Sequence, residues 1–137
     1  MTEAILIVDD DEDFVYLTRR RLARDGWEGG VDWVPDGDGA LTYFRERLDA
    51  SGSSALPSLV LVDINMPGMG GFELLPALER LFDEYGTPLP PPVLIMASSS
   101  HLEQDKAQAG ASRIVSGFLT KPVSATALRA YLAHASA

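Results

Sequence analysis

The chain has 137 residues, a length that fits one domain with a single sizeable core, and two packed domains are not expected. Apolar residues make up 46% and charged residues 23%, values typical of soluble globular proteins, and this composition excludes disordered, collagen-like and coiled-coil classes. The 20 acidic against 11 basic side chains give a formal charge of −9, which argues against direct binding of nucleic acid or of an anionic membrane.

Apolar runs alternate with segments of helical periodicity along the chain. In chain order, the predicted elements are a strand at 4–8, a helix at 14–25, a weak strand at 31–34, a helix at 38–48, a strand at 59–62, a helix at 72–82, a strand at 93–97, a weak helix at 103–109, a strand at 117–120 and a helix at 124–132. We expect a flexible loop at 51–54, a stiff connector at Pro88–Pro92 and an irregular exit from the weak helix.

Five strands that alternate with five helices predict an α/β fold, because parallel neighbours in a sheet need crossover connections. The continuous apolar character of three of the strands agrees with a sheet covered by helices on both faces. We therefore expect a doubly wound, five-stranded parallel sheet, in which ligands bind outside the carboxyl ends of the strands.

Polar residues stand where these strands end. Asp9 and Asp10 follow the first strand, Asp63 the third and Ser98 the fourth, while Lys121, one of only two lysines, follows the fifth. Three carboxylates at one sheet edge would repel one another unless they were protonated, paired with a cation or bound to a metal ion. Oxygen ligands without histidine or cysteine favour magnesium, with manganese as an alternative, over zinc.

This set of side chains suits phosphoryl chemistry. Asp63 is the candidate nucleophile, because a carboxylate can attack a phosphoryl group and form an aspartyl phosphate. Lys121 would place a positive charge near the phosphoryl oxygens, and the Ser98 hydroxyl would donate a hydrogen bond to one of them.

Three separated motifs resemble the receiver domain of two-component response regulators. They are Ile5–Asp13, Leu61–Leu75 and Phe118–Pro122, and the resemblance extends from about Ile5 to Leu132. It implies a flavodoxin-like receiver fold with strand order 2-1-3-4-5. We expect residues 1–137 to form a single receiver domain without an output domain.

The resemblance also implies roles for individual residues. Asp63 would be the phosphoacceptor and Lys121 the contact to the phosphoryl group, across a cis bond to Pro122. Asp10 would bind the metal ion directly, and Asp9 would act largely through water. The backbone carbonyl of Asn65 would complete the metal site.

The resemblance implies a switch as well. Phosphorylation would draw a hydroxyl toward the phosphate, and Phe118 would turn inward behind it, altering the face formed by the fourth helix, the fifth strand and the fifth helix. Ser98 is the expected hydroxyl and Ser99 the fallback, because three consecutive serines leave the register open.

The expected function is a stand-alone response regulator and not an enzyme beyond its own phosphorylation and dephosphorylation. Its partners would be a histidine kinase or phosphotransfer protein and a downstream protein, and it would be a monomer or a phosphorylation-dependent dimer. The N-terminus carries no export signal and no segment reaches membrane-spanning length, so a soluble cytoplasmic protein is expected.

Two alternatives share parts of this pattern. An aspartate-nucleophile phosphatase of the haloacid-dehalogenase type needs a second acid two residues after the nucleophile, where this chain has Asn65, and its acidic pair comes late in the chain. A flavodoxin-like cofactor binder would need a phosphate-binding loop after the first strand, where the acidic pair would repel phosphate.

Overall fold

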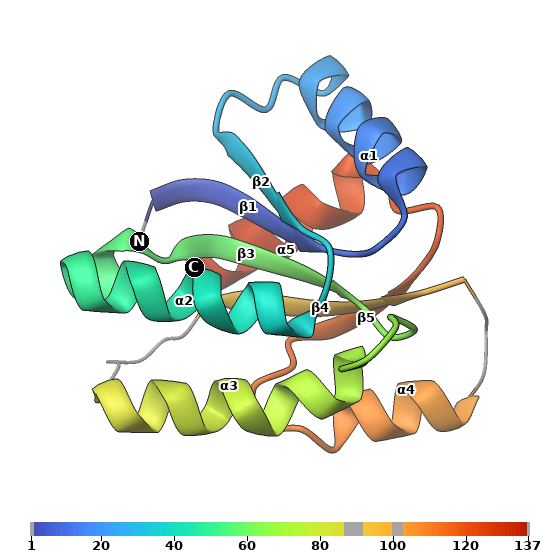
Figure 1. The fold of residues 1–137 in the computed structure, drawn as a ribbon. Coiled ribbons are helices and arrows are strands. Elements are labelled where there is room, and N and C mark those ends of the chain that lie inside the picture. Colours follow the sequence, from blue (N-terminus) through green and yellow to red (C-terminus); the bar gives the residue numbers. More distant parts are fainter. Residues whose placement is uncertain (1, 87–91, 100–102, 137) are drawn as a thin grey trace.

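Five parallel strands form a sheet at the centre of the molecule, and helices cover both faces of this sheet (Figure 1). The structure is a computed structural model that describes residues 2–86, 92–99 and 103–136. Its strands are β1 (Thr2–Val8), β2 (Gly30–Val34), β3 (Pro57–Asp63), β4 (Val93–Ser98) and β5 (Gly117–Thr120). Its helices are α1 (Glu12–Arg24), α2 (Gly37–Ser51), the short 3-10 helix η1 (Gly52–Ala55), α3 (Gly71–Tyr85), α4 (Glu103–Gly110) and α5 (Ala125–Ser136).

The strand order is β2-β1-β3-β4-β5, and every pair of neighbours is parallel. The predicted fold class is thereby confirmed. Val8 lies beside Val62, and Asp63 lies beside Ala97 on the next strand. Because the strands run in the same direction, the residues that follow β1, β3, β4 and β5 gather at one edge of the sheet.

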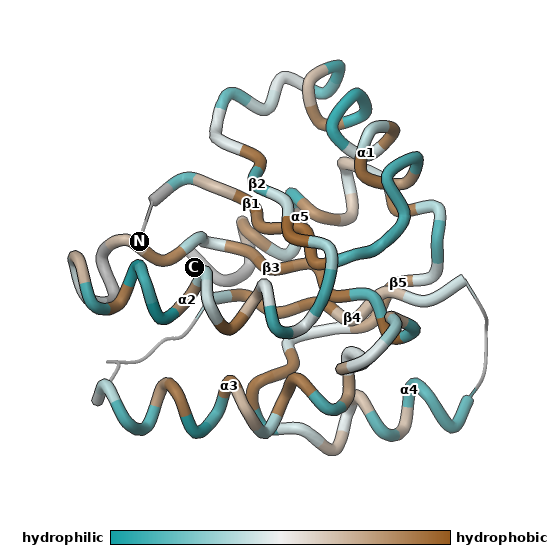
Figure 2. The backbone as a smooth tube through the Cα atoms, viewed as in Figure 1, coloured by the Kyte–Doolittle hydropathy of each residue, from teal (hydrophilic) through white to brown (hydrophobic). Residues whose placement is uncertain are grey.

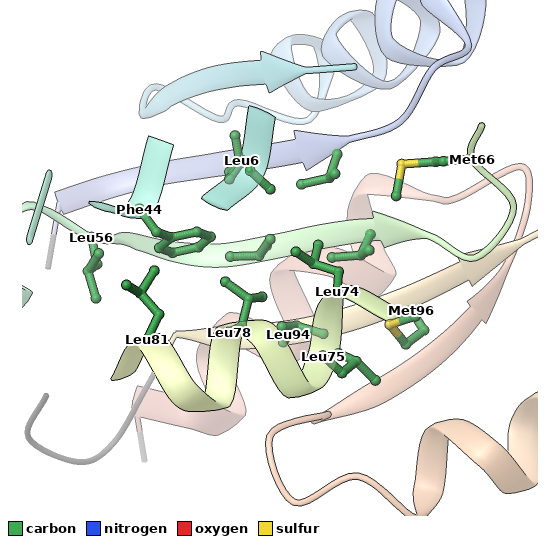
Figure 3. Packing of buried hydrophobic residues seen from close by; sticks show 14 of the residues in the cluster. Leu6, Phe44, Leu56, Met66, Leu74, Leu75, Leu78, Leu81, Leu94 and Met96 are labelled. Carbon is green, nitrogen blue, oxygen red and sulfur yellow. The ribbon is translucent and has the colours of Figure 1, made fainter. Parts of the chain in front are cut away.

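Alternating side chains divide the core into two clusters, one on each face of the sheet. Leu6, Val60 and Met96 pack on one face with residues of α2, α3 and α4, whereas Ile7, Leu61 and Ile95 pack on the other with α1 and α5. Hydrophobic residues follow the central strands in Figure 2. Figure 3 shows the first cluster, where Leu74, Leu78 and Leu81 of α3 point toward the strands and Phe44 of α2 lies beside them.

The prediction of a flexible loop at 51–54 was wrong. Ser51 still belongs to α2, and η1 follows directly. Gly52 has a positive φ of 64°, and its N–H donates to the carbonyl of Leu48, so this glycine ends the helix and starts the next turn.

Other expectations agree with the structure or lie outside it. Residues 111–116 contain neither helix nor strand, as expected for an irregular exit from α4. Four residues of the Pro88–Pro92 connector lie outside the described residues. Within the described part of the chain, no helix is both long and apolar enough to cross a membrane.

Candidate functional site

The alternation of β1, β3 and β5 determines which face of the sheet the polar residues share. Asp9 continues the series of Ile5 and Ile7, Asp63 continues that of Leu59 and Leu61, and Lys121 continues that of Leu119, all on the face covered by α1 and α5. Three predicted site residues from distant parts of the sequence are thus brought together at one sheet edge.

Lys121 bridges the two buried carboxylates. Its Nζ lies 2.7 Å from Oδ2 of Asp9 and 3.4 Å from Oδ1 of Asp63. Asp9 is 1% exposed and Asp63 is 6% exposed. Burying a charge is costly unless it is paired, so one lysine partly offsets the cost of two acids.

This environment changes the pKa values of both partners. Burial raises the pKa of the Asp63 carboxyl from 3.8 to about 6, and the charge of Asp9 adds to the rise, while Lys121 and the N–H of Asn65 oppose it. Burial alone would lower the pKa of Lys121, but Asp9 and then Asp63 hold it above its usual value. Near neutral pH Asp63 is therefore mostly ionised, as a nucleophile must be, and Lys121 is protonated.

All polar atoms of Asp9 have partners in the structure. Its N–H donates to the Val34 carbonyl at 3.1 Å, and its own carbonyl accepts a 2.7 Å hydrogen bond from the indole Nε1 of Trp33. Its Oδ1 accepts from the N–H of Asp11 at 2.9 Å, while its Oδ2 faces Lys121. Asp9 is therefore held in one position from β2, from its own loop and from β5.

The neighbours of Asp9 build the start of α1. Asp11 is the N-cap of the helix, and its side chain accepts from the N–H groups of Asp13 and Phe14. Asp10 lies between Asp9 and this cap and is exposed to solvent. The predicted acidic pair thus consists of one buried and one exposed carboxylate.

The loop after β3 begins close to Asp63. The N–H of Asn65 points to Oδ1 of Asp63 at 3.4 Å, and the Asn65 side chain is exposed. Gly71 starts α3 so close to this strand that an added Cβ would lie 2.5 Å from the Asp63 carbonyl oxygen. The absence of a side chain at Gly71 therefore allows α3 to begin against the site.

Ser98 and Phe118 belong to the opposite face of the sheet. Met96 of β4 pairs in register with Phe118 of β5, and both pack in the cluster under α2, α3 and α4. Ser98, two residues further, is fully buried, and its carbonyl accepts a hydrogen bond from the N–H of Lys121 at 2.8 Å. Ser99 is exposed. The two expected switch residues therefore share one face, and the backbone of Ser98 contacts that of Lys121.

The acidic cluster fits a hard divalent cation. Asp9, Asp10 and Asp63 each offer a carboxylate oxygen, and these oxygens lie within 4.8 Å of one another. Carboxylate oxygens are the donors that Mg²⁺ prefers, and three acids beside a single lysine leave an excess of negative charge that a divalent ion would neutralise.

Two aromatic contacts at the site were not predicted. The Nζ of Lys121 lies 4.3 Å from the ring centroid of Phe14, a cation–π contact, and the indole of Trp33 binds the Asp9 carbonyl. Phe14 belongs to the predicted helix at 14–25, and Trp33 belongs to the predicted weak strand at 31–34. Neither pattern carries a signal for a contact to a polar group far away in the sequence.

Comparison with known proteins agrees with this arrangement. The family model of the response regulator receiver domain matches residues 5–133 of this chain. The chain belongs to the response regulator receiver domain family. Receiver domains are generally phosphoacceptor switches of two-component systems and bind Mg²⁺ in an acidic pocket. The Lys121–Pro122 bond is cis, as the resemblance implied.

Individual relatives cover the chain to different extents. The probable methanogenesis regulatory protein FilR2 of Methanothrix harundinacea is 33% identical over 120 residues, which are 88% of this chain and 72% of that protein. The response regulator PleD of Caulobacter vibrioides is 36% identical over 123 residues, but these span only 24% of its length. The crystal structure of a two-component response regulator from Cytophaga hutchinsonii superposes with a TM-score of 0.86 at 27% identity, covering 98% of this chain and 97% of that one.

Proposed function

We propose that Asp63 accepts a phosphoryl group from a histidine kinase or phosphotransfer protein in a reaction that needs Mg²⁺. A carboxylate oxygen of Asp63 attacks phosphorus, a P–O bond forms, and the P–N bond to the donor imidazole breaks. Water later attacks the aspartyl phosphate, which returns the free carboxylate and inorganic phosphate. The chain would thus be a reversible switch, whose output is contact with another protein or transfer of the phosphoryl group.

The observation that carries this proposal is the ion-paired arrangement of Asp63, Lys121 and Asp9 at one sheet edge. Asp63 supplies the nucleophile, and Lys121 is within reach of groups bound to it. Asp9 and Asp10, together with the Asn65 carbonyl, would hold the metal ion. Bound Mg²⁺ would neutralise charge on the transferring phosphoryl group.

We further propose that Ser98 and Phe118 transmit the phosphorylated state. A phosphoryl group adds negative charge and hydrogen-bond acceptors at the end of β3. Ser98 ends β4 on the face opposite to Asp63, so its hydroxyl would have to turn over the edge of the sheet to donate to the phosphoryl group. Phe118, partly buried on the same face as Ser98, would then follow into the space that is left. The change would then reach α4, β5 and α5.

Incubation with acetyl phosphate and Mg²⁺, followed by intact-mass measurement, tests the central step. Here the P–O bond to acetate breaks, and the chain gains the mass of one phosphoryl group. We expect this gain in the wild type, its loss in Asp63→Asn and its loss after removal of Mg²⁺ with EDTA. Asp49 is an acid on α2, so Asp49→Asn is the matched control and should be phosphorylated normally. An undiminished mass gain in Asp63→Asn would overturn the proposal.

A further inference from the structure

The indole of Trp33 is the link between edge strand β2 and the acidic loop after β1. Trp33 is the penultimate residue of β2, where it lies beside Ile7 of β1 in register. Its ring is partly buried against the cluster beneath α1 and α5, and its Nε1 donates to the Asp9 carbonyl at 2.7 Å. This distance is at the short end of the range for N–H···O hydrogen bonds, so the bond is well formed.

The peptide unit that accepts this bond joins the two acids of the pair. Its oxygen belongs to Asp9 and its nitrogen to Asp10. The orientation of this peptide plane therefore determines the direction in which the backbone at Asp10 leaves the sheet. The N–H of Asp9 is held on the other side by the Val34 carbonyl at 3.1 Å. The end of β2 therefore fixes the backbone on both sides of the Asp9 α-carbon.

Asp9 has further restraints, but Asp10 has few. The carboxylate of Asp9 is held by Lys121 and by the N–H of Asp11. The Asp10 side chain is exposed, and its carboxylate makes no hydrogen bond or ion pair with another described residue. Its position near the other two carboxylates consequently depends on the backbone that carries it.

We propose that Trp33 is a positioning residue for the metal site, and that its indole N–H holds the Asp9–Asp10 peptide in the orientation that brings the Asp10 carboxylate toward Asp9 and Asp63. This inference rests on the Mg²⁺ site of the proposed function. Groups that orient metal ligands from outside the coordination sphere affect metal affinity strongly. Loss of this hydrogen bond should weaken Mg²⁺ binding about three- to tenfold, the range that corresponds to one such bond.

The chain offers a matched control in its second tryptophan. Trp27 precedes β2, is partly buried against the same cluster, and donates from Nε1 to the Gly30 carbonyl at 3.4 Å. It lies three residues before the first residue of β2, away from the carboxyl edge of the sheet. Trp27→Phe therefore makes the same exchange of an indole for a phenyl ring and removes an N–H group without touching the acidic loop.

The test is a titration of the unphosphorylated chain with Mg²⁺ alone, in which binding is detected by changes in the backbone amide shifts of two-dimensional NMR spectra. We expect the Kd for Mg²⁺ to rise three- to tenfold in Trp33→Phe and to stay within about twofold of wild type in Trp27→Phe. Urea unfolding of both variants gives their free energies of unfolding, so that a loss of Mg²⁺ affinity can be distinguished from a loss of stability. An unchanged Kd in Trp33→Phe, an equal loss in both variants, or no Mg²⁺ binding by the wild type would overturn the inference.

A second variant covers the case in which Trp33→Phe fails to fold. Benzothienylalanine at position 33, in a Trp27→Phe background, keeps the shape of the two-ring system but has sulfur in place of the N–H. It should show the same loss of Mg²⁺ affinity, and wild-type affinity would refute the role of the bond.

Phosphorylation by acetyl phosphate reports separately on the proposed function. A chain whose Mg²⁺ affinity depends on Trp33 but that gains no phosphoryl mass would disprove the proposed function and leave the inference standing. A chain that is phosphorylated but whose Mg²⁺ affinity does not change in Trp33→Phe would support the proposed function and disprove the inference about Trp33.

Discussion

The ammonium group of Lys121 lies 2.7 Å from the carboxylate of Asp9, although 112 positions separate the two residues in the chain. Both side chains are largely withdrawn from water, with 15% of Lys121 and 1% of Asp9 exposed. The pair joins the end of the last strand to the end of the first. It also brings the positive charge within 3.4 Å of Asp63, so that one ion pair serves both the stability of the sheet edge and the chemistry of the site.

Replacement of Lys121 by methionine should destabilise the metal-free protein strongly. Two buried carboxylates would lose their shared counter-ion, and breaking a buried pair from one side costs about 3–5 kcal/mol. Urea unfolding in EDTA measures this loss, and we expect Mg²⁺ to restore part of it, since the ion would neutralise the same carboxylates.

Lys106→Met is the control for this change. Lys106 is the only other lysine and is exposed on α4, so its replacement should alter the free energy of unfolding by no more than about 0.5 kcal/mol. Equal effects of the two substitutions would contradict the role given to Lys121.

The raised pKa of Asp63 predicts how stability varies with pH. A carboxyl whose pKa is about 6 in the folded chain and 3.8 in its ordinary state binds a proton more tightly when folded. Its contribution to stability is therefore fully present below pH 4 and is lost as the pH rises through about 6.

Asp63→Asn removes this titration and should gain stability relative to wild type as the pH rises from 4 to 7. We expect the difference in free energy of unfolding to change by about 2 kcal/mol in EDTA, since one pKa unit corresponds to about 1.4 kcal/mol. Unfolding curves of both proteins across this range provide the measurement. A difference that does not vary with pH would show that the Asp63 pKa is not raised.

Gly71→Ala should disturb the start of α3. The new methyl group would lie 2.5 Å from the Asp63 carbonyl oxygen and 3.0 Å from the α-carbon of Ile64, so the helix must move away from the site. Overpacking of this kind costs about 1–3 kcal/mol, and we expect slower phosphorylation by acetyl phosphate as well.

Gly110→Ala is the corresponding control in α4. A methyl group there meets nothing within 4 Å, so stability should stay the same or rise by about 0.5 kcal/mol through helix propensity. Wild-type stability and phosphorylation rate in Gly71→Ala would disprove the close approach.

The burial of Ser98 and the exposure of Ser99 lead to a test of the switch. Ser98→Ala should still accept the phosphoryl group, within about threefold of the wild-type rate, because the nucleophile and Lys121 are unchanged. We expect it to lose the response of Phe118, measured by aromatic NMR shifts on addition of beryllium fluoride with Mg²⁺ as a stable mimic of the phosphoryl group. Ser99→Ala should retain that response, and the opposite pattern would assign the switch to Ser99.

The sequence predicted the sheet and its polar edge because both follow from short-range patterns. Three strands are continuous apolar runs, and the residues that end them meet at one edge once the strands are parallel. The proximity of Asp9, Asp63 and Lys121 could therefore be predicted from the sequence alone.

The contacts of Phe14 and Trp33 could not be predicted in the same way. Periodicity identifies the face of an element that is buried, but it does not show which atom of an aromatic ring meets a polar group on another element. The indole of Trp33 reaches a carbonyl 24 positions away, and the ring of Phe14 lies beside a lysine from the other end of the chain. The turn at Gly52 was missed because a glycine- and serine-rich stretch suits a helix end as well as an open loop.

The two-residue period of β3 also limits which changes in its length the protein can tolerate. Deleting one residue between Leu59 and Val62 would move the β3 residues beyond the deletion to the opposite face and turn the Asp63 carboxylate toward α3, away from Lys121. Deleting two would restore the orientation but draw the carboxylate back by roughly 6.6 Å along the strand, out of reach of the lysine. Functional variants of this strand should consequently differ by substitution and not by insertion or deletion.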